Sequence, residues 1–67
     1  MDVRKRLGRN VQRLRREKGW SQEELADRSG LHRTYVSGIE RGVRNPTIKI
    51  VERVALALEC PLRQVIE

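Results

Sequence analysis

Cysteine and aromatic residues are almost missing from this chain, which has one cysteine, one tryptophan, one tyrosine and no phenylalanine. Cys60 alone can form neither an internal disulfide nor a Cys-based zinc site, because such a site needs several ligands. No apolar run approaches the roughly 20 residues that span a bilayer, and no apolar signal-peptide core follows the N-terminal charges. We therefore expect a cytoplasmic protein with an aliphatic core, no membrane contact and no metal.

Charge is concentrated at one end of the chain, which has 67 residues and a formal net charge of +6. The first 18 residues hold eight basic and two acidic side chains, which accounts for the whole excess. Such a concentration favours a polyanionic partner, and a solvated cationic helix is the alternative at this point. A chain of this length can bury one small core, so we expect a single domain over residues 1–67 whose stability would gain from a dimer contact.

Residues 21–42 contain the most informative pattern in the sequence. Ser21 can act as the N-cap of a helix by accepting the backbone N–H three residues on. Gly30 supplies the left-handed conformation that ends this helix after about two turns. A second helical period then begins, with apolar residues on one face and Arg, Thr and Ser on the others, and Gly42 is its expected end. Two short helices joined by a Gly-containing turn are a helix-turn-helix pattern.

Three further helices are predicted around this pattern. The first runs from about Asp2 to Lys18, the fourth is capped by Thr47, and a short fifth helix covers Pro61 to Ile66. The apolar residues at helical spacing are Val3, Leu7, Val11 and Leu14 in the first helix and Ile48, Val51, Val54, Ala55 and Leu58 in the fourth. No strand candidate is found. The chain is therefore predicted to be an all-α, compact five-helix bundle.

Several motifs together resemble a known family of regulators. They are Gln22-x-x-Leu25-Ala26, Gly30-Leu31, Tyr35-Val36-Ser37-x-Ile39-Glu40-Arg41-Gly42 and Asn45-Pro46-Thr47. Over about Arg9 to Val65 the sequence resembles the Cro and phage-repressor type of helix-turn-helix regulator, called XRE-like, whose fold is lambda-repressor-like. The run from His32 to Tyr35 followed by Arg44-Asn45 also resembles the controller proteins of restriction–modification systems, which are small dimers.

This resemblance implies that the third helix enters the major groove of DNA. Its first turns would then direct Arg33, Thr34 and Ser37 toward base edges, with Gly38 as a further candidate. A guanidinium can bond guanine O6 and N7 together, so Arg33 is the strongest candidate for reading a base. Gly38 departs from the larger polar side chain of some relatives, and either weaker readout or a closer approach of the backbone is expected there.

The resemblance also implies contacts to DNA phosphates. Gln22 stands where the family holds a phosphate together with the amides of a helix N-terminus. Tyr35 can fill core, reach a phosphate with its hydroxyl, or do both. His32 is either a weak N-cap or a phosphate donor. Arg44 and Asn45 lie in the loop where relatives touch the backbone or nearby bases, and a turn-forming role is the alternative for Asn45.

Two other groups of residues are expected to support the fold and its assembly. In the family an Arg of the first helix pairs with a Glu at the end of the recognition helix, and Arg15 and Glu40 occupy those positions. Apolar residues outside the predicted stripes are candidates for a homodimer contact. They are Ile50, Leu62, Val65 and Ile66. The alternative for Leu62 and Val65 is that they close the end of the bundle.

We therefore expect a transcriptional regulator that binds double-stranded DNA sequence-specifically, as a homodimer on a (pseudo)palindromic operator, with neither a cofactor nor a small-molecule ligand. An antitoxin-type or other protein-interaction module with secondary DNA binding is the alternative. An enzyme is disfavoured, because the chain has neither a strand-turn-helix arrangement that would present a nucleophile nor a glycine-rich phosphate loop. A single-strand RNA platform is disfavoured by the shortage of stacking aromatics.

Overall fold

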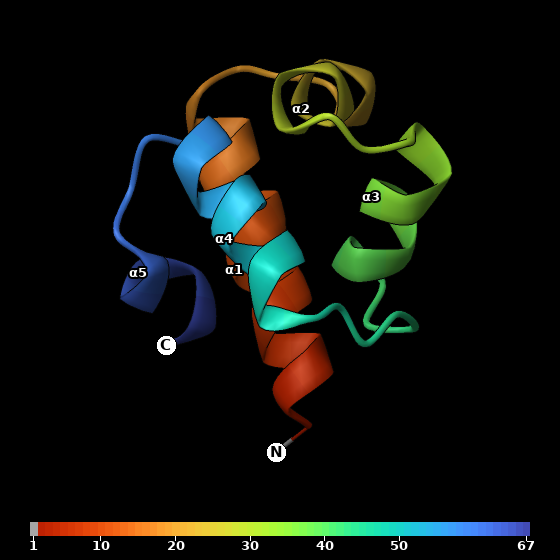
Figure 1. Ribbon diagram of the computed structural model, residues 1–67, viewed down its shortest axis with the longest axis vertical. Coiled ribbons are helices and arrows are strands. Elements are labelled where there is room, and N and C mark those ends of the chain that lie inside the picture. The colour runs from red at the N-terminus through yellow and green to blue at the C-terminus, as the bar shows by residue number, and fades with distance from the viewer. Residues whose placement is uncertain (1) are drawn as a thin grey trace.

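The N-terminal helix α1 (Val3–Glu17) begins where the side chain of Asp2 accepts the backbone N–H of Arg4 at 2.9 Å. It is the longest helix of a computed structural model that describes residues 2–67. Leu7 and Val11 of its predicted stripe are buried, but Val3 is 62% exposed. Val3 is exposed because the first turn of α1 extends beyond the elements that pack against the rest of the helix, as Figure 1 shows.

The helix-turn-helix consists of α2 (Gln22–Ser29) and α3 (Arg33–Glu40). The hydroxyl of Ser21 accepts the backbone N–H of Glu24 at 3.0 Å, as predicted. Gly30 ends α2 in the left-handed region with φ 71°, a conformation that costs glycine little. His32 occupies the N-cap of α3, and its side chain makes no hydrogen bond to the helix.

The C-terminal part consists of α4 (Ile48–Ala57) and α5 (Leu62–Ile66). Thr47 caps α4 by accepting the backbone N–H of Ile50 at 3.3 Å. Ile48 was expected on the buried stripe, but it is 62% exposed because it lies in the first turn, at the margin of the core. Pro61 is the N-cap of α5 and the helix proper begins one residue later.

The five helices enclose one aliphatic core, and the described residues form no strand. α3 packs against α1 and α2, α2 also packs against α4, and α5 packs against both α1 and α4. Figure 1 shows α3 and α5 on opposite sides of the molecule. The buried apolar residues are Leu7, Val11, Leu25, Ala26, Val36, Ile39, Val51, Val54, Ala55, Leu58 and Val65. The predicted all-α five-helix bundle is confirmed. None of the described helices is long and apolar enough to cross a membrane.

Val65 packs into the bundle, which was the alternative for this residue, and its predicted place in the dimer contact is wrong. Its side chain is 0% exposed, so it belongs to the core and cannot form part of a dimer surface. The Nδ2 of Asn10 donates to the carbonyl oxygen of Val65 at 2.9 Å and fixes α5 against α1. Ile50 and Leu62 are half-buried and pack against the core, whereas Ile66 is 37% exposed.

Candidate nucleic-acid interface

The outward face of α3 carries the predicted reading residues. Arg33 and Thr34 in its first turn are exposed, and Ser37 is half-buried one turn further on. Val36 and Ile39 on the opposite face are almost completely buried, with 1% and 2% exposure. The apolar face therefore fixes the rotation of the helix, and this rotation leaves the polar side chains directed away from the core.

The loop after α3 contributes two more predicted residues, Arg44 and Asn45, which are both exposed. The guanidinium carbon of Arg44 lies 5.3 Å from the ring centroid of Tyr35, a distance at which a cation is attracted to an aromatic face. Tyr35 is half-buried and its ring packs against the core. Gly38 is buried, and the atoms nearest to the position of a Cβ on it belong to Arg44.

A buried ion pair joins α1 to the end of α3. Arg15 Nε donates to Glu40 Oε2 at 2.6 Å, and Arg15 Nη2 donates to Glu40 Oε1 at 2.9 Å. This is the two-pronged geometry that a guanidinium forms with a carboxylate. The hydrogen bonds that Arg15 donates to Glu40 raise the pKa of Arg15 above its usual value. The third guanidinium nitrogen, Arg15 Nη1, donates to the carbonyl oxygen of Trp20 at 2.7 Å, so Arg15 also fixes the segment that leads into α2.

Gln22 belongs to the same network. Its Nε2 donates to Glu40 Oε1 at 3.1 Å, and its side chain is half-buried at the N-terminus of α2. A side-chain amide has two N–H groups, so one can bond Glu40 while the other is free for an external acceptor. The first backbone amides of α2 lie at the same end of the helix and, like other helix N-termini, favour an anion.

Sequence reasoning missed Gly8, which sits where α1 meets α3. A Cβ on Gly8 would meet the carbonyl oxygens of Ile39 and Glu40, the second at 2.6 Å. Glycine therefore permits the close approach that brings Arg15 into reach of Glu40. The available signal was a glycine inside a strongly periodic helix, since glycine there costs about 1 kcal/mol relative to alanine and usually has a packing reason.

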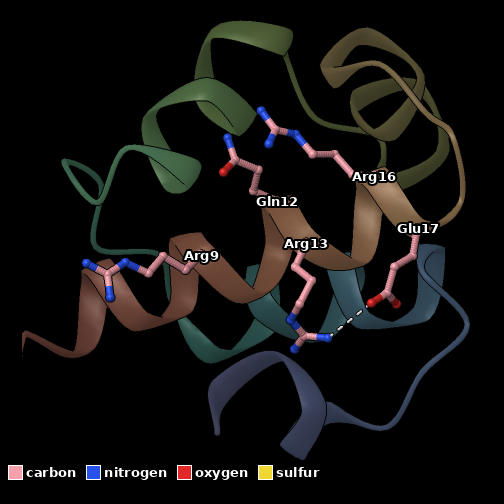
Figure 2. Close-up of a pocket in the computed structure, with 5 residues that line it drawn as sticks. All are labelled: Arg9, Gln12, Arg13, Arg16 and Glu17. Atoms are coloured by element: carbon pink, nitrogen blue, oxygen red, sulfur yellow. Dashed lines mark hydrogen bonds and ion pairs between the residues drawn. The ribbon is translucent and has the colours of Figure 1, made fainter.

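The outer face of α1 is a second basic surface, which we call the α1 face. Its residues Arg9, Gln12, Arg13, Arg16 and Glu17 line a hollow of about 390 Å³. Arg9, Arg13 and Arg16 are all exposed, and Arg13 Nη1 lies 3.5 Å from Glu17 Oε2. Figure 2 shows Gln12 and Arg16 pointing to the side of α1 where α2 and α3 lie, and Arg13 pointing to the side of α5.

The sequence matches the helix-turn-helix family over residues 11–65. The chain belongs to this family. It is 53% identical over 58 residues to an HTH-type transcriptional regulator of Sinorhizobium fredii, y4dJ, and the matched region covers 87% of this chain and 75% of that protein. Other curated relatives are longer, and this chain spans 54% and 56% of two of them. The XRE-like resemblance of the sequence is thereby confirmed.

Two solved structures are similar to the whole fold. The hypothetical transcription factor NHTF from Neisseria has a TM-score of 0.95 and 44% identity, over 98% of this chain and 76% of that one. The restriction–modification controller protein C.Esp1396I, solved as a tetramer with its natural 35 base-pair operator, has a TM-score of 0.86 and 35% identity. That comparison covers 100% of this chain and 99% of the controller protein. Controller proteins are therefore among its relatives.

Proposed function

We propose that this chain regulates transcription by binding a two-fold symmetric DNA operator as a homodimer, with α3 in the major groove. The observation that carries the proposal is the face of α3, where Arg33 and Thr34 stand exposed on a helix whose rotation the core fixes. An exposed arginine in the first turn of such a helix can reach guanine O6 and N7, and the threonine methyl can contact thymine.

Phosphate contacts would fix the register of this helix on the duplex. Gln22 is the main candidate, because its amide is oriented by Glu40 and lies at the N-terminus of α2. His32, Tyr35 and Asn45 are further candidates near the two ends of α3. The α1 face adds a basic surface that is not needed for reading bases and would contribute sequence-independent attraction.

A homodimer is expected because one recognition helix reads only a few base pairs, and two helices one turn of DNA apart read a symmetric site. Ile50, Leu62 and Ile66 remain as the proposed contact once Val65 is assigned to the core. The controller protein that this chain resembles over its full length was solved as a tetramer on its operator, which supports an oligomeric binding mode. The sign of regulation is left open.

We further propose that residues 1–67 act as one domain in the cytoplasm and carry no catalytic activity. No group of three His, Cys, Asp or Glu residues that could hold a metal occurs in the described part of the chain. Cys60 is half-buried, and burial raises the pKa of its thiol, which makes it a poor nucleophile near neutral pH.

The test is selection of a randomised duplex pool by the purified protein at about 150 mM salt, which suppresses non-specific attraction. We expect enrichment of an inverted repeat with half-site centres about 34 Å apart. Arg33→Ala should relax the preference at one base pair of each half-site by about 5- to 100-fold. Salt-sensitive binding to every duplex without enrichment would contradict the proposal and favour a protein partner as the main ligand.

A further inference from the structure

The loop after α3 folds back onto the outward side of that helix. Gly42, with φ 75°, turns the chain, and the backbone N–H groups of Val43 and Arg44 both donate to the carbonyl oxygen of Gly38, at 3.0 and 3.2 Å. The backbone of Arg44 is thereby fixed to the last turn of the recognition helix. Its side chain starts from a defined position beside α3.

The side chain of Arg44 occupies the space that a side chain on Gly38 would need. A Cβ on Gly38 would lie 2.5 Å from Arg44 Cγ, 3.2 Å from its Nε and 3.4 Å from its Cδ. At the other end, the guanidinium lies 5.3 Å from the ring centroid of Tyr35, one turn earlier on α3. Arg44 therefore lies along the surface of α3, between the backbone of Gly38 and the ring of Tyr35.

Gly38 follows Thr34 by four residues, so the two positions are neighbours on one strip of the helix surface. Thr34 is exposed on the face proposed to read bases. The stem and guanidinium of Arg44 cover Gly38, so they lie next to Thr34. They occupy the place where a longer residue at position 38 would present its own side chain.

We infer that Arg44 acts as part of the reading surface in place of a side chain at position 38, and that Gly38 determines operator preference by leaving room for it. This inference rests on the proposed function and names the residue pair that sets one position of its specificity. The stack on Tyr35 restricts the guanidinium before DNA arrives, which lowers the entropic cost of binding. Gly38 is a positioning residue, and Arg44 is the group that touches the base pair.

Gly38→Ala tests the inference because its Cβ would meet Arg44 Cγ and force the side chain of Arg44 to move from its place on α3. The conflict is with a side chain and not with backbone, and alanine favours a helix more than glycine does. The thermal unfolding midpoint should not fall below that of the wild type. In the free protein, NMR should show the δ protons of Arg44 shielded by the ring of Tyr35, and Gly38→Ala should return them toward ordinary shifts.

The DNA measurement uses four proteins: the wild type, Gly38→Ala, Arg44→Ala and the double variant. Each is used to select from the same randomised pool. Gly38→Ala should lower the preference at the same base pair as Arg44→Ala, by about 5- to 100-fold, and should add nothing in the Arg44→Ala background. Thr34→Ala is the matched control and should alter a different base pair.

Three results with Gly38→Ala would overturn the inference. They are an unchanged Arg44 spectrum in Gly38→Ala, a wild-type base preference in that variant, and full additivity of the two substitutions. These results differ from a failure of the proposed function, in which the wild type itself enriches no inverted repeat and both proposals fall. A uniform loss of affinity across all sequences for Arg44→Ala would assign the guanidinium to a phosphate and would also refute the inference.

Discussion

Glu40 is the acceptor that links α1, α2 and the end of α3. Its carboxylate accepts two hydrogen bonds from Arg15 and one from Gln22, and its side chain is 1% exposed. Glu40→Ala should lower the free energy of unfolding by about 3 kcal/mol or more, because it leaves a buried guanidinium without its counter-charge. For a domain of this size the thermal midpoint should fall by more than 10 °C, roughly, and calorimetry or urea unfolding would measure it.

Glu40→Gln is the control for this prediction, since glutamine keeps the volume and one acceptor but removes the charge. It should have intermediate stability. The pKa of Arg15 is raised by its partner, so the stability that the pair contributes is present below the usual arginine pKa and is lost only as pH rises through the raised folded value. The effect of Glu40→Ala should therefore persist across neutral and mildly alkaline pH, and an unchanged midpoint would contradict the role of the pair.

At this scale the sequence predicted what depends on local chemistry. The caps at Ser21 and Thr47 need only a hydroxyl and a nearby amide, and both are present. The partner of Gln22 was not predicted, because its hydrogen bond to Glu40 depends on how α2 packs against the end of α3. The shielding of Gly38 by Arg44 was missed for the same reason.

At the scale of elements, Gly8 sets how closely α1 can approach α3. Gly8→Ala would stabilise an isolated helix by about 1 kcal/mol, but here the methyl group meets backbone carbonyls of Ile39 and Glu40, which cannot rotate away. We expect a net destabilisation of about 1–3 kcal/mol, as for other overpacked sites. Urea unfolding would measure it, with Arg9→Ala on the exposed face as a near-neutral control. A variant more stable than the wild type would show that α1 and α3 can move apart enough to accommodate the methyl group.

The positions of the helices could be predicted from the apolar period and the capping residues. Whether the apolar residues at the helix ends are buried could not. Val3 and Ile48 follow the apolar spacing and are nevertheless exposed, because burial at a helix end depends on where the neighbouring elements stop. In α5 the five residues are too few for a period to distinguish core from surface. Val65 was therefore grouped with Ile66, although one faces the core and the other is partly exposed.

At the scale of the whole molecule, the proposed dimer contact can be tested by charge. Ile66→Asp should give a folded monomer with much weaker operator binding, because a carboxylate cannot be buried in an apolar contact without a partner. Sedimentation would measure the mass, and circular dichroism would check the fold. Leu56→Asp is the matched control, since Leu56 is 71% exposed on α4 and lies outside the proposed contact. A dimer in Ile66→Asp and a monomer in Leu56→Asp would move the contact away from α5 to the surface of α4 that carries Leu56.

The α1 face makes a separate prediction about binding at long range. Arg9 and Arg16 are exposed and have no acidic partner among the ion pairs of the described residues, whereas Arg13 pairs with Glu17. If Arg9 and Arg16 reach DNA phosphates, replacing both by alanine should reduce the slope of log affinity against log salt. The reduction should be about 0.9 per protomer for each phosphate that is no longer neutralised. Base preference should stay unchanged, since phosphates carry no sequence information.

Arg13→Ala is the control for this prediction. It removes a charge that is paired with Glu17 and should change the slope less. An unchanged slope in the double variant would mean that the excess charge of α1 only solvates the outer surface, and the affinity would then have to come from α2, α3 and the loop between α3 and α4.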